Sequence, residues 1–286
     1  MSLVIDAHQH VWDLDRSEYG WLTPALGPLH RTFAEEELLP QLVACGVDRT
    51  VLVQAEDSSV DTDLMFETAD RHADVVAGVV GWVPLERPHE AEAELERRLT
   101  DPRFCGVRHL IHDDPDPDWL RRPAVLDGLR LLADHGVPFD VVAVLPRHLE
   151  HVPFLVEQVP ELRLVIDHLA KPPIAQRGWE PWAELLRRAA EAPTVYAKLS
   201  GLNTAADPAS WTADDLRPYV EHALDCFGPA RLMFGGDWPV ALLAGDYPKV
   251  VRETRRLLEQ LGDAERDRVL GGTAVEAYGL RVETAR

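Results

Sequence analysis

Cysteine is scarce in this chain, with Cys45, Cys105 and Cys226 the three examples in 286 residues. Three widely spaced cysteines argue against a disulfide framework and a zinc knuckle, and they suit a reducing compartment. No run of about 18 apolar residues is present, so the sequence predicts no membrane-spanning helix. The first residues also lack the basic segment and long apolar stretch of a signal peptide. We therefore expect a cytoplasmic protein.

Positive charge is also in deficit. Lysine and arginine number 29 against 49 aspartates and glutamates, which gives a formal net charge of −20 at pH 7. Such a charge argues against nucleic acid and anionic membranes as partners, because both repel an acidic protein. A small-molecule substrate is the expected partner. The sequence carries no coiled-coil signal and leaves the oligomeric state unpredicted.

Two common catalytic and binding motifs are missing. There is no Gly-x-Ser-x-Gly elbow, which argues against a serine hydrolase. There is also no glycine-rich turn after the first apolar segment, where a dinucleotide-binding fold would carry one. That segment, Leu3–His10, ends instead in His8-Gln9-His10. Because side chains alternate along a strand, we expect Asp6, His8 and His10 to share one face.

Short apolar runs alternate with amphipathic segments along the whole chain. We predict eight strands, at Leu3–His10, Thr50–Ala55, Val75–Val83, Gly106–Ile111, Pro138–Ala143, Arg163–Leu169, Thr194–Gly201 and Arg231–Asp237. Strands separated by single helices form parallel neighbours with right-handed crossovers, and eight such units close into a (β/α)₈ TIM barrel. An open, doubly wound sheet is the second choice. No linker interrupts residues 1–286, so we expect a single domain.

The predicted helices have recognisable boundaries. Thr32-Phe33-Ala34-Glu35 has the pattern of a capping box and predicts a helix that ends near Gly46. Pro88 and Pro123 suit the first turns of two others, and Gly136 suits a helix C-cap. Further helices are expected at Pro146–Val159, Trp179–Glu191, Ala213–Phe227, Pro248–Gln260 and Ala264–Leu270. The long, aromatic connection at Val11–Arg31 is expected to form a lid or wall of a site, or a set of aromatic plugs that cover the rim of the barrel.

Polar side chains gather where the predicted strands end. In a barrel, these ends form the face that carries the chemistry, and buried ionisable groups are costly unless they are paired. The residues in question are His8, His10, Gln54, Trp82, Arg108, His109, Asp140, Asp167, His168, Lys171, Lys198, Ser200, Asp237 and Trp238. Apolar packing does not account for these endings, so we expect a functional site at this face.

Several of these segments resemble a known family. His8-x-His10, His168 and Asp237 are similar to the pattern of the amidohydrolase superfamily, specifically amidohydrolase family 2. Asp167-His168-Leu169-Ala170-Lys171-Pro172 and Gly235-Gly236-Asp237-Trp238-Pro239 resemble the sugar-lactone lactonase branch. That branch includes L-fuconolactonases and L-rhamnonolactonases and is related to the pyrone-dicarboxylate lactonases. Thr273 departs from the asparagine expected in the closing helix, and we expect this departure to affect stability.

This resemblance implies a hydrolase that opens a sugar-acid lactone. We expect Asp237, at the end of the last strand, to be the general base that activates a water. His8, His10, His168 and Arg108 would then polarise the carbonyl or bind substrate hydroxyls. Further candidates for substrate binding are His109, Gln54, Trp12, Trp82, Lys171 and Trp238. Lys198, like Lys171, could contact substrate oxygens, and His112, His148 and His151 are expected at the surface.

The residues at the ends of the fourth and fifth predicted strands indicate whether the site can hold metal ions. A two-metal site would need a carboxylated lysine and a histidine there, whereas this chain has Arg108, His109 and Asp140. A single zinc on His8, His10 and Asp237 has acceptable ligands, but the permanent charge of Arg108 opposes a nearby cation. We therefore expect no required cofactor, with one Zn²⁺ as the alternative. A zinc-dependent decarboxylase or amidase and a non-catalytic binding barrel are the competing functions.

Overall fold

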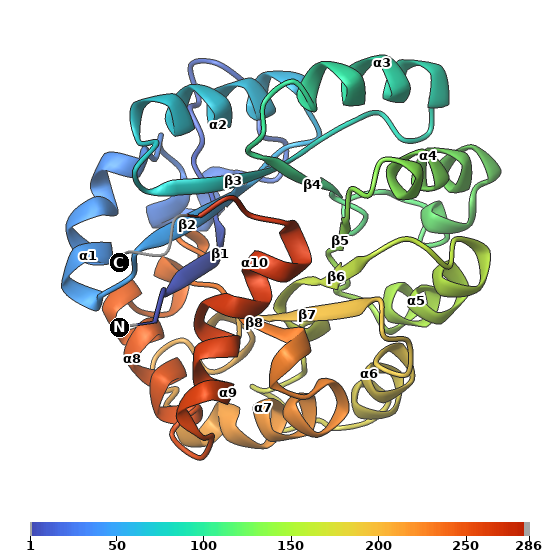
Figure 1. Cartoon of the computed structure of the whole chain (residues 1–286). Helices are drawn as coiled ribbons and strands as arrows, with labels where there is room; N and C mark the ends of the chain where they lie inside the picture. Colours follow the sequence, from blue (N-terminus) through green and yellow to red (C-terminus); the bar gives the residue numbers. More distant parts are fainter. Residues whose placement is uncertain (1, 283–286) are drawn as a thin grey trace.

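Eight parallel strands follow one another around a barrel in the computed structural model, which describes residues 2–282 (Figure 1). Each strand pairs with the next one along the chain. The strands are β1 (Ile5–Gln9), β2 (Arg49–Val53), β3 (Val76–Gly81), β4 (Phe104–His109), β5 (Phe139–Val141), β6 (Leu164–Ile166), β7 (Val195–Leu199) and β8 (Leu232–Phe234). The predicted (β/α)₈ TIM barrel is therefore confirmed, and the alternative of an open, doubly wound sheet is excluded.

Helices cover the outside of the barrel and one of its ends. The outer helices are α1 (Leu39–Cys45), α2 (Ser59–Arg71), α3 (Pro88–Arg98), α4 (Pro123–Asp134), α5 (Pro146–Gln158), α6 (Trp182–Ala189), α7 (Ala213–Phe227) and α8 (Tyr247–Leu257). Two short helices follow, α9 (Asp263–Asp267) and α10 (Thr273–Tyr278). No helix among the described residues is long and apolar enough to cross a membrane.

The first and last strands meet through backbone hydrogen bonds just beyond their ends. The amide of Asp237 donates to the carbonyl of His8, and the amide of His10 donates to the carbonyl of Trp238, both at 2.8 Å. Gln9 and Trp238 form the corresponding parallel bridge. These bonds bring the histidine pair of β1 beside the aspartate that follows β8.

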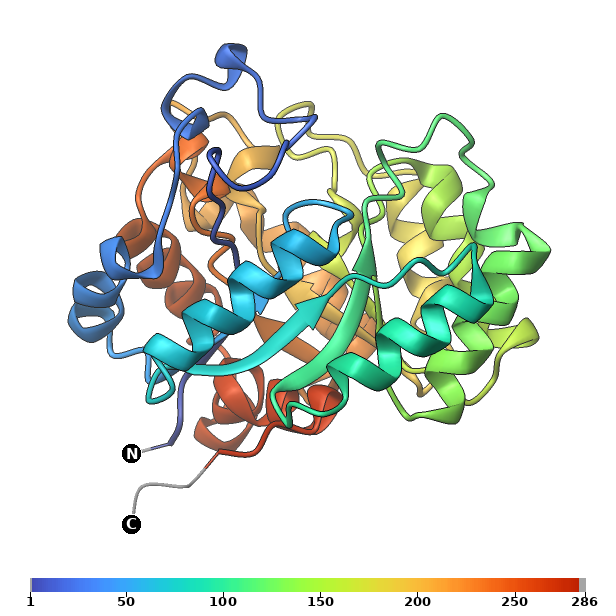
Figure 2. The same ribbon diagram turned by 90° about the horizontal axis from the view of Figure 1, so that it is seen from above.

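The N-terminal end of the barrel is closed by α10, which lies across it in Figure 1. Ala274 and Ala277 of this helix pack with Ile5, Ala7 and Val51 in one buried apolar cluster. The long connections after β1 and β4 rise at the opposite end, away from α10 and both termini (Figure 2). The C-terminal strand ends therefore form the accessible face, as expected for this fold.

A bulge in β1 overturns one prediction about its side chains. Asp6 pairs with Thr50 and Gln9 pairs with Leu52, so β1 advances three residues where β2 advances two. A bulge changes the alternation of faces along a strand. The Asp6 carboxylate accepts from Tyr247 of the outer helix α8 at 2.8 Å, and His8 faces the barrel interior. Asp6 and the two histidines therefore do not share a face.

The predicted capping box at Thr32 is also wrong. The Thr32 hydroxyl donates to Asp13, and a short 3₁₀ turn at Glu35–Glu37 precedes α1. Glu35 is fully buried, and neither of its carboxylate oxygens has a hydrogen-bond partner among residues 2–282. Burial and the nearby Asp6 carboxylate raise the pKa of Glu35 to about 8.

This pKa predicts a stability effect of Glu35→Gln. Because the pKa is raised in the folded state, the contribution of Glu35 to stability is complete below about pH 4.5 and is lost as the pH rises through about 8. The amide cannot ionise, so the variant should be more stable than the parent at pH 9, by about 3–5 kcal/mol. At pH 4.5 the two should be nearly equal.

Denaturant unfolding of both proteins at pH 4.5 and pH 9 checks this prediction. Glu259→Gln, at an exposed position after α8, is the matched control and should show no gain at either pH. If the stability of Glu35→Gln and that of the parent depended on pH in the same way, the raised pKa of Glu35 would be contradicted.

Candidate active site

His8 of β1 and His10, which directly follows this strand, lie at the floor of the site; His10 lines the cavity, and His8 is buried behind it. The His10 ring lies with Nδ1 2.7 Å from the Val53 carbonyl, which can only accept, so Nδ1 carries the proton. The Nε2 atoms of His10 and His8 are 3.1 Å apart. Burial lowers the pKa of both rings, so both are neutral at pH 7.

Asp237 lies beside this pair, in a left-handed backbone conformation with φ 54°. Its Oδ1 is 3.5 Å from His10 Nε2 and 3.8 Å from His8 Nε2. Its Oδ2 is buried and has no hydrogen-bond partner in the described chain. Burial raises the pKa of Asp237, but His168, His10 and Lys171 outweigh burial and lower it to about 2. The carboxylate is therefore ionised and has one oxygen free to accept a proton.

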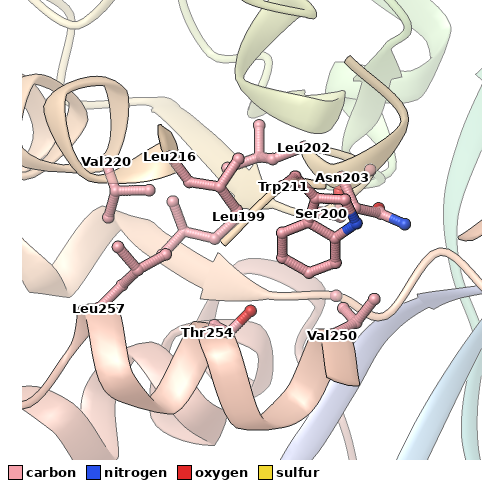
Figure 3. Close-up of a pocket in the computed structure, with 12 residues that line it drawn as sticks. Leu199, Ser200, Leu202, Asn203, Trp211, Leu216, Val220, Val250, Thr254 and Leu257 are labelled. Carbon is pink, nitrogen blue, oxygen red and sulfur yellow. The ribbon is translucent and has the colours of Figure 1, made fainter. Parts of the chain in front are cut away.

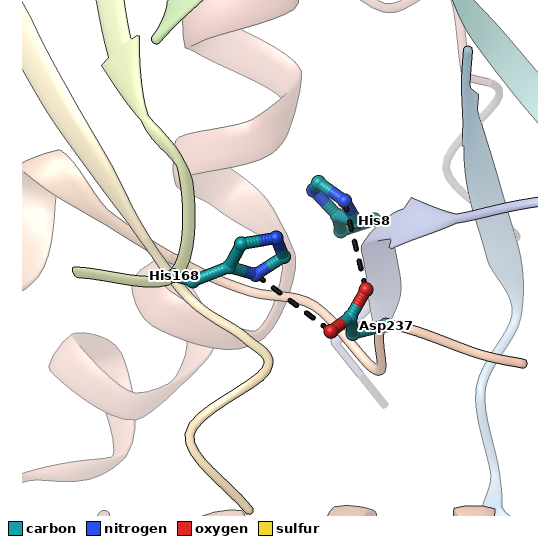
Figure 4. Close-up of side chains that lie close together, drawn as sticks. All are labelled: His8, His168 and Asp237. Atoms are coloured by element: carbon teal, nitrogen blue, oxygen red, sulfur yellow. Dashed lines mark ion pairs between the residues drawn. The ribbon is translucent and has the colours of Figure 1, made fainter. Parts of the chain in front are cut away.

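His168 and Lys171 reach the site from a left-handed turn. Residues 168–171 all have φ between 48° and 58°, although none is glycine, and such strain is typical of functional sites. His168 Nδ1 is 2.8 Å from the Ser200 hydroxyl and 3.9 Å from Asp237 Oδ2 (Figure 4). Lys171 donates to Thr204 Oγ1 at 3.0 Å, and burial lowers its pKa.

Arg108 of β4 brings a permanent positive charge to the same floor. Its Nη1 is 3.1 Å from Asp167 Oδ2 and 3.3 Å from His8 Nε2, and its Nη2 donates to the Gln54 carbonyl. Gln54 Nε2 in turn donates to the Arg108 carbonyl at 3.2 Å. The Arg108 guanidinium is therefore held between Asp167 and the Gln54 carbonyl.

A buried ionic network lies beneath the floor. Lys198 is 2.6 Å from Asp140 and 3.0 Å from Asp167, and all three side chains are inaccessible to solvent. Tyr278 of α10 donates to Asp140 at 2.8 Å. Lys198 is thus placed to support His8 rather than to contact substrate. No role for Asp167 was predicted from the sequence, although its place beside His168 at a strand end was a usable signal.

Above the floor, the site opens into a cavity of about 250 Å³, near the lower end of the range for small-molecule sites. Among the predicted site residues, the cavity wall includes His10, Arg108, His168, Lys171 and Asp237. The upper wall is mostly apolar and is formed by Trp21, Leu26, Leu29, Ala55, Leu110, Val142, Val144, Val240 and Leu243. Since Trp21, Leu26 and Leu29 belong to it, the connection after β1 is a wall of the site, as expected.

Five predicted substrate-binding residues lie outside this wall. Gln54 supports Arg108 from behind, and the Trp12 indole donates to the Arg31 carbonyl at 2.6 Å within an aromatic cluster. Trp238 is fully buried against Phe33.

His109 and Trp82 form the remaining pair of these five residues. His109 stacks on Trp119 at 3.9 Å and accepts from the Trp82 indole at 3.3 Å. These aromatic side chains pack against one another and do not line the cavity.

Three other histidines also differ from their predicted surface positions. His112 lines the cavity mouth, where its side chain is about 29% exposed. His148 and His151 are buried in α5, and His151 Nε2 donates to the Pro117 carbonyl at 2.9 Å. His112 is therefore an additional candidate for contact with substrate, which its loop position in the sequence did not indicate.

The donor atoms at the floor lie close enough together to surround one metal ion. His8 Nε2, His10 Nε2 and Asp237 Oδ1 are separated by 3.1, 3.5 and 3.8 Å, and a point about 2 Å from all three exists, close to a Zn–N distance. His8, His168 and Asp237 also present atoms within 4.8 Å of one another (Figure 4). The donor positions therefore fit one divalent ion, provided that each histidine offers a lone pair.

A second cavity lies outside the barrel wall, between β7, α7 and α8 (Figure 3). Leu199, Leu216, Val220 and Leu257 line it, and the Trp211 ring faces it. Its lining includes no charged side chain, so we treat it as a gap in the packing and not as a catalytic site.

Comparison with known proteins agrees with this geometry. A family model described as amidohydrolase matches residues 5–280. The chain is 39% identical to an L-fucono-1,5-lactonase of Burkholderia ambifaria over 98% of this chain and 97% of that protein. It is 36% identical to an L-fucono-1,5-lactonase of Burkholderia multivorans over the same shares. A crystal structure of a Burkholderia multivorans amidohydrolase with bound zinc superposes with a TM-score of 0.89 at 33% identity, covering 98% of this chain and 100% of that one.

Proposed function

Because this chain belongs to the amidohydrolase family and is a sugar-lactone hydrolase, we propose that it opens an aldonolactone such as L-fucono-1,5-lactone, with Asp237 as the general base. One observation supports the role of Asp237 above all. Its carboxylate is ionised, its buried Oδ2 has no hydrogen-bond partner within residues 2–282, and Asp237 lines the cavity. A water that approaches this carboxylate from the cavity can donate a proton to it and direct a lone pair at a lactone carbonyl.

The positive groups of the floor stabilise the charge that develops during this attack. Addition of water to the carbonyl places negative charge on its oxygen, and preorganised donors lower the barrier when they point at that oxygen. Arg108 and Lys171 both line the cavity and bring two cations to this position. His10 and His168 line the same floor and provide further polar contacts for the carbonyl and the ring hydroxyls.

Ring opening completes the reaction. The tetrahedral intermediate collapses, the carbon–oxygen bond of the ring breaks, and the proton held by Asp237 passes to the leaving alkoxide. The products are a carboxylate and a hydroxyl group on one open chain. A lactone is an activated ester, so these residues are sufficient for the attack, and the anionic product is repelled by the acidic protein.

We further propose that no metal is required. His8, His10 and Asp237 would hold a divalent ion, which would supply Lewis-acid polarisation of the carbonyl when bound. Against this stands Arg108, whose permanent charge lies 3.3 Å from His8 Nε2 and opposes a cation there. The related Burkholderia multivorans amidohydrolase was crystallised with bound zinc, so removal of metal is the decisive arm of the test. The three free cysteines of the described chain suit a cytoplasmic site of action.

Proton release from a panel of aldonolactones, with and without chelator, tests this function. We expect rapid hydrolysis of one or two six-membered lactones that survives removal of metal. Buffer without enzyme serves as the blank, because lactones also hydrolyse spontaneously, and the Asp237→Asn protein is assayed beside the parent. Activity lost with chelator and restored by zinc would favour a metal-dependent site, including the decarboxylase and amidase alternatives. No hydrolysis of any lactone would favour a non-catalytic binding barrel.

A further inference from the structure

Lys198 has no place in the reaction described so far, although it lies directly behind the catalytic floor. Its Nζ is 3.1 Å from His8 Nδ1, 2.6 Å from Asp140 Oδ2 and 3.0 Å from Asp167 Oδ1. Two carboxylates at ion-pair distance make this group an ammonium, which has three protons to donate and no acceptor. With Lys198 as the donor, His8 Nδ1 must be the acceptor.

The other side of the ring requires the same arrangement. His10 carries its proton on Nδ1, where it donates to the Val53 carbonyl, so His10 Nε2 offers a lone pair. His8 Nε2 lies 3.1 Å from that lone pair. A hydrogen bond between the two rings therefore places a proton on His8 Nε2. Both contacts of His8, one on each ring nitrogen, are satisfied by the same neutral tautomer.

The opposite tautomer is poorly supported. A proton on His8 Nδ1 would face the Lys198 ammonium at 3.1 Å, and the acceptor that would favour it, Asp167 Oδ1, is farther away at 3.3 Å. The contact that would favour a lone pair on Nε2 is the longer one to Arg108 Nη1, at 3.3 Å. That nitrogen already donates to Asp167 Oδ2 at 3.1 Å.

We propose that Lys198 is a positioning residue that holds His8 in its Nε2–H tautomer, so that His8 donates to His10 Nε2 instead of offering a metal-binding lone pair. Asp140 pairs with the Lys198 ammonium at 2.6 Å, and Tyr278 donates to the same carboxylate from the closed end of the barrel. The positions of the donor atoms fit a metal, whereas the proton on His8 opposes one. The catalytic value of this donor rests on the proposed function, but the tautomer itself does not.

Long-range ¹H–¹⁵N spectra of the protein labelled with ¹⁵N-histidine test the proposal directly. The 12 histidines are separated by comparison with a His8→Asn spectrum. We expect a protonated, pyrrole-type Nε2 and a pyridine-type Nδ1 for His8 in the metal-free parent. The reverse assignment would overturn the proposal. This measurement needs no substrate, so it stands or falls apart from the lactonase activity.

A charge-balanced variant then identifies Lys198 as the cause. Lys198→Met combined with Asp140→Asn removes one positive and one negative charge from the network, which leaves its net charge unchanged. We expect His8 to change to the Nδ1–H tautomer and zinc to bind about ten- to a hundredfold more tightly, as measured by competition with a chelating dye. An unchanged tautomer in this folded variant would overturn the role of Lys198.

Tyr278→Phe is the matched control. It removes the hydroxyl that donates to Asp140 and leaves Lys198 in place. We expect the Nε2–H tautomer and the zinc affinity of the parent. A change of tautomer in this control would show that general disturbance of the network, and not Lys198, decides the proton position. If the charge-balanced variant does not fold, the spectrum of the parent still decides the tautomer.

Discussion

Replacement of Asp237 by asparagine is expected to lower kcat/KM for lactone hydrolysis by about a thousandfold, within the usual range for loss of a general base. The amide keeps the size of the side chain and can still contact His10, but it cannot accept a proton from water. The pKa of Asp237, lowered to about 2, keeps the parent carboxylate ionised at all pH values where the protein is assayed. Initial rates, corrected for spontaneous hydrolysis, measure the loss.

Asp225→Asn is the control for this substitution, because it makes the same chemical change at an exposed position on α7. It should retain the activity of the parent. Thermal unfolding of both variants shows whether each is folded. Activity of a folded Asp237→Asn protein within tenfold of the parent would remove Asp237 from the role of base.

The second large effect is expected for Gly201→Ala. A methyl group at this position would lie 2.6 Å from Asp237 Oδ2 and 2.7 Å from His168 Nδ1. It would therefore occupy the space next to the oxygen that is proposed to accept the water proton. We expect kcat to fall by at least about a hundredfold, because such displacements of catalytic groups are costly.

Gly201 also has φ +56°, so an alanine there adds backbone strain that has to be separated from obstruction of the site. Gly136→Ala is the matched control: its φ is +66°, and no atom of the described chain lies within 4 Å of the added methyl. Gly136→Ala should lose about 1 kcal/mol of stability from backbone strain. Gly201→Ala should lose about 1–3 kcal/mol more because its methyl group displaces buried atoms, and it alone should lose activity. Equal activities in the two variants would contradict the proposed water position.

The fold was predictable because alternation of strands and helices needs only local patterns. Apolar runs located all eight strands, but their ends were less well predicted. The sixth was extended to Leu169, whereas β6 ends at Ile166 and the chain continues into the left-handed turn. Residues such as His168 and Lys171 have no intrinsic preference for that turn, so tertiary contacts must stabilise it.

Helix α2 shows a second limit of pattern analysis, because no helix was predicted for that segment. Its buried face includes Asp61, Thr62 and Thr68 beside the apolar Leu64 and Met65. Buried polar residues interrupt the apolar stripe by which an amphipathic helix is recognised. Asp61 is buried because it accepts from the Ala55 amide and the Tyr19 hydroxyl, contacts that no local pattern reveals.

The site was predictable to the extent that it depends on strand ends. The structure brings His8, His10, Arg108, His168 and Asp237 together as the barrel geometry requires. Side chains beyond the strand ends were harder to place, because their direction depends on loop packing. Trp82 and His109 point into an aromatic stack, and His112 turns to the cavity mouth. The role of Lys198 depends on distances to three groups that are far apart in sequence.

One measurement tests the central claim, that Asp237 delivers water to the lactone carbonyl. Enzyme in excess over lactone is mixed in H₂¹⁸O for a single turnover, and the product acid and the peptide containing Asp237 are weighed by mass spectrometry. The account predicts one ¹⁸O in the product carboxylate in the first turnover and none in Asp237. Unlabelled product together with ¹⁸O in Asp237 would show that the carboxylate attacks the carbonyl itself, and would contradict the account.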